Sequence, residues 1–294
     1  MADDLTNRRL GPGERQLSRL LWPAGRINDD FLQPRGEAAL LAPDSVSWRV
    51  FSNPIAVFVG GVAAVVLELA EPRVRTGVWE NTRFREQPLQ RLQRTGYAAM
   101  LSVYGPRSRV LPMIAGVRRL HDSLAGTAPD GQPFRASDPD LLEWVHATAS
   151  FGFLEAYQAC VRALPVAARD RFYAEAEPIA RLYGCEAAPR SEAELRSLFA
   201  RMDEHLEASP VVHEFLGIVA RMPALPTLLR PFQALLVRAA VDLVPAHLRR
   251  RLSLEPWHLH AWQRLAVRSA AAALERWPLR THPAAHARSR LGLA

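Results

Sequence analysis

Lysine is absent from this sequence, and all 37 basic residues are arginine. No lysine amine can therefore form a Schiff base, act as a general base or bind a metal ion. The formal net charge of +7 is spread along the whole chain, with one short run at Arg249, Arg250 and Arg251. Aromatic residues do not alternate with a basic stripe, as a base-stacking platform would require. We therefore expect no nucleic-acid partner, although positive charge by itself favours one.

Cysteine is nearly absent too, since Cys160 and Cys185 are too few for a disulfide framework or a cluster of thiolate ligands. The sequence also lacks the G-x-S-x-G nucleophile elbow, the Walker loop and the dinucleotide-binding G-x-G-x-x-G. No histidine pair at helical spacing is accompanied by the glutamate of a helical zinc site. The histidines considered for such a site are His121, His205, His213, His258 and His260. These absences disfavour hydrolases of the zinc and serine types and P-loop enzymes.

Long apolar runs are missing as well. The most hydrophobic run is Ile55 to Leu67, and Glu68 follows it directly. This run is shorter than the roughly 20 residues of a membrane span and typical of a buried core helix. The amino terminus has no apolar core of a secretory signal. We therefore expect a soluble, cytoplasmic protein with no stable membrane insertion, and the pair Gly60 and Gly61 predicts close approach of another helix or a flat ligand.

Helical periodicity recurs along most of the chain, and strand alternation is almost absent. The pattern predicts one all-α domain over residues 35–294, after an irregular amino-terminal arm over residues 1–34. The clearest turn is Asp130-Gly131, between two long helices. The expected helices lie near residues 36–42, 54–71, 86–104, 108–125, 139–163, 166–183, 191–207, 210–222, 226–243 and 257–276.

The helix over residues 139–163 carries the residue of most interest, His146. Asp138 is a good N-cap and Pro139 suits the first helical position. His146 shares one helical stripe with apolar and aromatic residues: Leu142, Ala149, Phe153 and Tyr157. A buried neutral imidazole here is either a core histidine bonded to a backbone carbonyl or an axial ligand of a haem iron.

Three successive blocks read RRLHDSLAG (118–126), RASDPDLLEWVHATASFGFLEAY (135–157) and RDRFYAEAEPIARLYG (169–184). Further segments precede and follow them: FREQPLQRLQRTGYAAMLSVYG (84–105), VPAHLRRRLSLEPW (244–257) and HPAAHAR (282–288). Together these segments resemble the latex-clearing protein and MpaB-like oxygenase family, and the D-P-x-L-L-x-W-V-H-A-T block is the most specific of them. The resemblance covers most of the chain from about residue 40. It implies an all-helical fold with a globin-like core that holds haem b.

The resemblance also implies roles for individual residues. His146, in the W-V-H-x-T block, would be the proximal iron ligand, and a nearby carboxylate would orient its other ring nitrogen. The distal side would come from residues 118–126, with His121 and Arg118 as the catalytic candidates. Arg118 is also a candidate for binding a haem propionate, together with Arg94 and Thr95.

Rubber-cleaving members place a lysine on the distal side, within an arginine-x-x-lysine-threonine pattern, and this chain has none. Arg118-x-x-His121-Asp122 stands at the place that we match to it. The sixth iron position would then be open, filled by water or taken by His121, and we expect the open or water-bound state. Without that lysine, the resemblance does not carry a rubber substrate over to this chain.

The function expected from this resemblance is a haem b-dependent oxygenase that adds dioxygen to an apolar, unsaturated, isoprenoid-like substrate. The iron would do the difficult chemistry, and the protein would provide the ligand and a dry pocket. A peroxidase-like haem enzyme and a non-enzymatic haem sensor or carrier are the alternatives. A helical interaction protein without haem is a further one.

Overall fold

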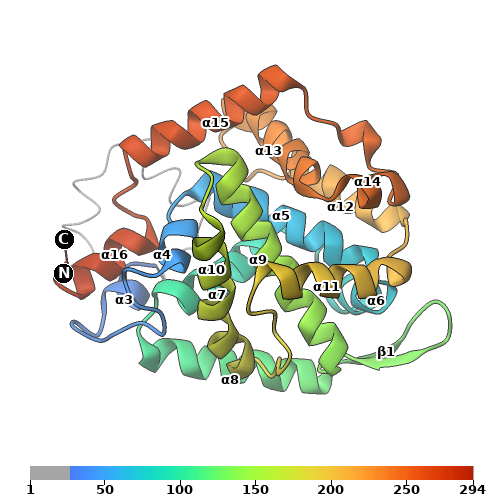
Figure 1. The fold of residues 1–294 in the computed structure, drawn as a ribbon, viewed down its shortest axis with the longest axis horizontal. Helices are drawn as coiled ribbons and strands as arrows, with labels where there is room; N and C mark the ends of the chain where they lie inside the picture. The colour runs from blue at the N-terminus through green and yellow to red at the C-terminus, as the bar shows by residue number, and fades with distance from the viewer. Residues whose placement is uncertain (1–26, 294) are drawn as a thin grey trace.

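The computed structural model describes residues 27–293, which fold into the all-α domain that the sequence predicts (Figure 1). The α-helices are α3 (Ile27–Leu32), α4 (Val46–Val50), α5 (Pro54–Ala70), α6 (Pro72–Asn81), α7 (Pro88–Tyr104), α8 (Arg107–Ser123), α9 (Pro139–Cys160), α10 (Val166–Leu182), α11 (Glu192–Met202), α12 (Pro210–Arg221), α13 (Arg230–Leu243), α14 (Ala246–Arg251), α15 (Ala261–Arg276) and α16 (Pro283–Arg290). Three short 3-10 helices join them, η1 (Asp203–His205), η2 (Thr227–Leu229) and η3 (Glu255–Trp257). One small antiparallel hairpin pairs β1 (Ala125–Thr127) with β2 (Pro133–Arg135).

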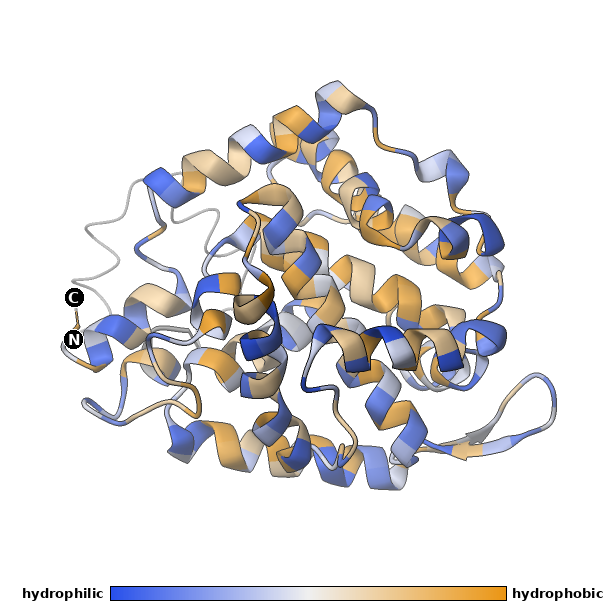
Figure 2. Ribbon diagram, viewed as in Figure 1, coloured by the Kyte–Doolittle hydropathy of each residue, from blue (hydrophilic) through white to orange (hydrophobic). Residues whose placement is uncertain are grey.

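Helix α5 is the centre of the fold. Asn53 caps it, because its side-chain Oδ1 accepts hydrogen bonds from the backbone amides of Ile55 and Ala56, at 3.1 and 3.3 Å. Pro54 follows at the first helical position, where its missing N–H costs no hydrogen bond. No residue of α5 is exposed, and Figure 2 shows the central helices as predominantly hydrophobic. The apolar run therefore forms a buried core helix, as the sequence predicts.

Helices α5 and α9 cross in direct backbone contact at Gly60 and Gly152. A Cβ atom added to Gly60 would lie 2.7 Å from the carbonyl oxygen of Gly152, and one added to Gly152 would collide with the carbonyl oxygen of Gly60. Only glycine permits this approach of two backbones. The close helix crossing predicted from the glycine pair is thus confirmed at Gly60.

The remaining helices cover this pair. Helices α12, α13 and α15 pack over one side of the α5–α9 pair, and α10 and α11 pack against α9 (Figure 1). At the far left of Figure 1, α16 packs against α3, so the two ends of the described chain lie side by side. Its buried Arg290 donates hydrogen bonds to the carbonyls of Phe31, Glu37 and Tyr104, at 2.7, 2.9 and 2.8 Å. Three carbonyl dipoles thus stabilise a guanidinium inside the protein.

Several local predictions were wrong. Residues 36–42 form no helix but an extended segment with a bridge between Ala39 and Pro106. The arm predicted as irregular contains α3, whereas residues 1–26 lie outside the described part. Helices α4, α6, α14 and α16 were not predicted, because all but α6 are shorter than nine residues and carry too few turns for periodicity to show. The Asp130-Gly131 turn is present, with Gly131 at a φ of +87°, but it closes a hairpin of two strands.

Among the described residues, no single helix has both the length and the hydropathy of a membrane span. Helices α5 and α6 reach these criteria only as a pair, and they are bent by 110° relative to each other.

We expect Gly60→Ala to lower the free energy of unfolding by about 1–3 kcal/mol or more, because the new methyl group would press on backbone atoms that cannot rotate away. Gly96→Ala is the matched control, since a Cβ atom at Gly96 in α7 meets nothing within 4 Å. Replacing that helical glycine should leave stability unchanged or raise it by up to about 1 kcal/mol. Urea denaturation of both variants without added ligand measures the difference, and equal stabilities would contradict the crossing.

Candidate functional site

Helix α9 carries the W-V-H-A-T block with His146 and starts at a tight turn. Asp138 is its N-cap residue, as predicted, and Pro139 is its first residue. The Asp138 carboxylate does not cap the helix, however, because its Oδ2 accepts a hydrogen bond of 2.9 Å from the backbone amide of Arg135. It thereby ties the helix start to the end of β2. The hairpin and α9 thus form one continuous unit that fixes the position of the helix.

His146 lies two turns into α9, with its imidazole inside the protein. Its Nε2 atom is 3.4 Å from Oγ of Ser150, at the outer limit for a hydrogen bond. No described backbone carbonyl accepts a hydrogen bond from this ring. Burial lowers the pKa of His146 to about 4, and the negative charge of Glu177 on α10 opposes that shift only partly. The imidazole is therefore neutral at pH 7, with a nitrogen lone pair free to bind a metal ion.

Space around this helix is incompletely filled. One stripe of α9 is only half-buried although it lies at the centre of the fold: Leu142, His146, Ala149 and Phe153. A stripe of α5 is half-buried in the same way: Val57, Gly61, Val65 and Glu68. The two stripes adjoin, because a Cβ atom on Gly61 would lie 3.8 Å from the ring of Phe153. Residual accessible surface on central helices indicates that their neighbours leave room beside them.

Glu68 is a carboxyl group in this interior. Burial raises the pKa of Glu68 to about 7, against the opposing effects of the Arg91 charge and of a hydrogen bond with Thr148. Thr148 follows His146 by two residues on α9, and its hydroxyl also lies 3.1 Å from the carbonyl oxygen of Trp144. A carboxyl group that titrates near neutral pH can hold or release a proton under ordinary conditions.

Arg91 on α7 connects Glu68 electrostatically to His121 on α8. Burial lowers the pKa of Arg91, and the charge of Glu68 partly compensates for it. Burial also lowers the pKa of His121, with a further small decrease from Arg91, while Asp122 opposes the shift. The Nδ1 atom of His121 is buried and has no hydrogen-bond partner among the described residues. A buried polar atom without a partner is costly and favours binding to a ligand.

The other candidates lie nearer the surface. Arg118 is exposed, but its guanidinium lies next to Leu142, since both would contact a Cβ atom on Gly184, at 3.7 and 3.6 Å. Arg94 and Thr95 are exposed, and the Thr95 hydroxyl accepts a 2.6 Å hydrogen bond from Arg91. Arg118 therefore borders the stripe of His146, whereas Arg94 and Thr95 lie on the exposed side of α7 near Arg91.

The known family that fits this chain is that of the ER-bound oxygenase mpaB/B′ and rubber oxygenase catalytic domain, whose sequence model matches residues 48–276. The chain belongs to this family. The match spans both half-buried stripes and every candidate residue named above, so the candidate site lies within the matched domain. No curated protein and no solved structure shows significant similarity to the chain.

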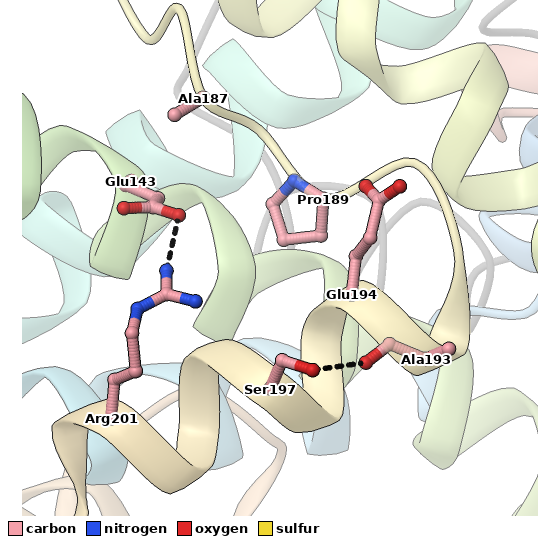
Figure 3. Close-up of a pocket in the computed structure, with 7 residues that line it drawn as sticks. All are labelled: Glu143, Ala187, Pro189, Ala193, Glu194, Ser197 and Arg201. Carbon is pink, nitrogen blue, oxygen red and sulfur yellow. Dashed lines mark hydrogen bonds and ion pairs between the residues drawn. The ribbon is translucent and has the colours of Figure 1, made fainter.

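Two other possible sites in this oxygenase-family domain, the hollow in Figure 3 and the pair His258 and His260, do not involve the candidate residues. The hollow in Figure 3, of about 290 Å³, lies between α9 and α11, and two of its charged lining residues, Glu143 and Arg201, pair with each other. Arg201 donates a 3.0 Å hydrogen bond to Glu143 there. The described residues contain no group of three or more histidines, cysteines or acids able to hold a metal ion. His258 and His260 stack edge to face before α15 rather than on a helix.

Both cysteines are free and buried, and burial raises the pKa of each thiol to about 11. Neither thiol is therefore a nucleophile at neutral pH. This agrees with the sequence-based exclusion of a disulfide framework.

Sequence reasoning missed Glu68 as part of the site. Its one visible signal was a single carboxylate at the end of an apolar run, which we interpreted only as the limit of a hydrophobic segment. Thr148 and Glu177 were missed as well, because their relation to Glu68 and His146 depends on helix packing. A charged residue inside a helix that is otherwise apolar on every face would have been the signal to follow.

We expect Glu68→Gln to stabilise the protein at pH 8 by up to about 3 kcal/mol, because folding raises the pKa of Glu68 from its ordinary value of 4.5 to about 7. The raised pKa means that wild-type stability falls as the pH rises from 4.5 to 7, while the buried carboxyl loses its proton. The stabilisation should therefore disappear near pH 4.5. Urea denaturation across this range measures it, with Glu204→Gln, an exposed residue of η1, as the control. An equal effect of Glu68→Gln at both ends of the range would contradict the assigned pKa.

Proposed function

We propose that this protein is a haem b-dependent oxygenase in which His146 binds the iron and an apolar, unsaturated substrate reacts with dioxygen. The observation that carries the proposal is the state of His146. Its imidazole is neutral, lies inside the protein, and has only one marginal hydrogen bond, although an unsatisfied ring nitrogen is costly. Metal coordination would satisfy that nitrogen.

The surrounding residues fit a flat apolar group. The half-buried stripes of α5 and α9 supply aliphatic and aromatic side chains, and Gly61 leaves the surface of α5 without a side chain at its position. Gly96 on α7 has open space where a side chain would begin. Haem sites are typically apolar and helix-walled, with a few polar groups toward the rim. Arg91, Arg94 and Thr95 on α7 are polar groups that could bind carboxylates at such a rim.

When bound, haem iron would supply the activation of dioxygen, which no side chain of this protein can perform. The protein's own contribution is to position groups and control protons. Glu68 can hold or release a proton near neutral pH, and it lies close to Thr148, two residues after His146. His121 offers a buried ring nitrogen with no other partner, and Arg118 a fixed positive charge next to Leu142. The apolar stripes exclude water and would favour an unsaturated hydrocarbon chain over a polar substrate.

A peroxidase-like activity is the second candidate, and the unpartnered Nδ1 of His121 favours it. Such an enzyme needs a distal acid and base with a charge partner, which His121 and Arg118 could provide. Oxygen-electrode measurements with unsaturated isoprenoids separate the two candidates. Oxygen uptake with stoichiometric carbonyl products supports the oxygenase, whereas turnover only with hydrogen peroxide supports the alternative. Haem binding without either activity would indicate a sensor or carrier.

We expect His146→Ala to reduce haem content by about tenfold or more, while far-ultraviolet circular dichroism stays largely unchanged. The coordination bond is lost, but the apolar walls remain. His205→Ala, at an exposed position on η1, is the matched control and should retain wild-type haem content. The Soret absorbance per protein reports the outcome. A wild-type Soret band in His146→Ala would refute the assignment of the ligand.

The sixth iron position is expected to be open or water-bound. His121 has a short side chain on a peripheral helix, and an imidazole reaches less far than the lysine used by rubber-cleaving relatives. The ferric wild-type protein should therefore be high-spin and shift readily on addition of imidazole or azide. A low-spin ferric spectrum that becomes high-spin in His121→Ala would show instead that His121 is the ligand.

A further inference from the structure

Helix α15 presents an unusual outward face. Its inward stripe packs on the core and contains Gln263, Val267 and Ala271, all buried. The outward stripe follows at intervals of three and four residues: Trp262, Leu265, Ser269, Ala272 and Arg276, all exposed. The side of a helix that faces water is normally polar and carries charges of both signs. This one begins with two large apolar side chains.

The exposure of these apolar residues is large. Trp262 is 65% exposed, Leu265 66%, and Trp277, directly after the helix, 71%. Five of the nine exposed large apolar residues in the described chain lie on α15, at its end or in η2, at the start of neighbouring α13. The two in η2 are Leu228 and Leu229, and α13 packs against α15. Exposed apolar residues that gather in one region mark an interaction surface, whereas scattered ones need no explanation.

The outward stripe carries only positive charge, and Glu275 is an exposed acid on the flank of the helix that also carries Arg268. Arg268 and Arg276 are exposed, and neither forms an ion pair with a described carboxylate. The single acid of α15, Glu275, is held at the side by a 3.2 Å hydrogen bond from the amide of Asn53. The outward stripe therefore combines tryptophan, leucine and arginine with no carboxylate. That is the composition of helices that lie in the interface of an anionic lipid layer.

The dimensions of the face favour lipid over a second copy of the chain. A helix of 16 residues is about 24 Å long, and one face about 10 Å wide offers roughly 240 Å². A stable dimer interface requires about 800 Å² from each partner. A lipid layer requires no matching surface, because Trp262 and Leu265 can enter it singly. Tryptophan is also well suited to such interfaces, since its ring is apolar and its N–H is polar.

We propose that the outward face of α15 docks the protein on an anionic membrane surface, with Trp262 and Leu265 entering the interface and Arg268 and Arg276 binding lipid phosphates. In Figure 1, α15 runs along the outer rim of the fold, so no other described helix lies beyond it. The docking is peripheral, because α15 is held to α5 and α9 on its inner side. It does not depend on haem or on the oxygenase proposal.

Co-sedimentation of the full-length protein with phosphatidylcholine vesicles containing 30% phosphatidylglycerol (about one third anionic lipid, enough for a strong negative surface potential) tests the docking. Trp262→Ala/Leu265→Ala should reduce the partition coefficient by at least about tenfold. Arg268→Gln/Arg276→Gln should reduce it about tenfold on these vesicles and little on pure phosphatidylcholine. Leu120→Ala is the matched control, because Leu120 on α8 is 53% exposed and should have no effect.

Failure of the wild-type protein to bind anionic vesicles overturns the proposal, as does an equal loss in the Leu120→Ala control. Light scattering of the protein without lipid tests the alternative that this face binds a second copy of the chain. A wild-type dimer that becomes monomeric in Trp262→Ala/Leu265→Ala would assign the face to a second copy. Quenching of tryptophan fluorescence by brominated lipids tests the same contact in a minimally altered protein. Trp262→Phe should keep vesicle binding but remove part of this quenching. Unchanged quenching would show that another surface enters the membrane.

Discussion

The contact between the backbones of Gly60 and Gly152 is the constraint on which the arrangement of the site depends. A second contact joins Leu67, seven residues after Gly60 on α5, to Trp144, eight residues before Gly152 on α9. There the indole N–H of Trp144 donates a hydrogen bond to the carbonyl of Leu67, at 3.3 Å. The two helices therefore run antiparallel in a fixed register. That register brings Glu68 to Thr148, close to His146 in sequence. A wider crossing would separate these residues, because the side chains in contact are too short to span a larger gap.

Burial shifts titratable groups in the interior toward their uncharged forms, although Glu68 stays partly ionised near pH 7. Burial raises the pKa of Glu68 and lowers that of His146, so both shifts favour the neutral form. Arg91 is the cation whose charge stabilises the remaining ionised fraction of Glu68. The half-buried, mostly apolar space beside a neutral imidazole and a carboxyl group with a pKa of about 7 would suit the proposed oxygen chemistry on a hydrocarbon. The same space would be unsuited to hydrolysis of a polar substrate, because few fixed dipoles are present to stabilise developing charge.

The absence of lysine has consequences in two places. In the proposed haem site it excludes a lysine ligand to the iron, and His121, the candidate for that position, sits on the peripheral helix α8. On the surface it leaves arginine as the only cation, and arginine binds phosphates with two parallel hydrogen bonds.

The sequence by itself determined the helical class, the long helices, the family and the interior position of His146. Each follows from local information: apolar residues at intervals of three and four, capping residues such as Asp138 and Pro139, and the W-V-H-A-T block. Short helices such as α4 and α14 were not predicted, because five or six residues complete too few turns to show a period. Only the tertiary structure decided that Glu68, Arg91 and His121 act on one another, since they lie on three different helices. Their pKa shifts depend on burial and on neighbours distant in sequence, and packing alone sets both.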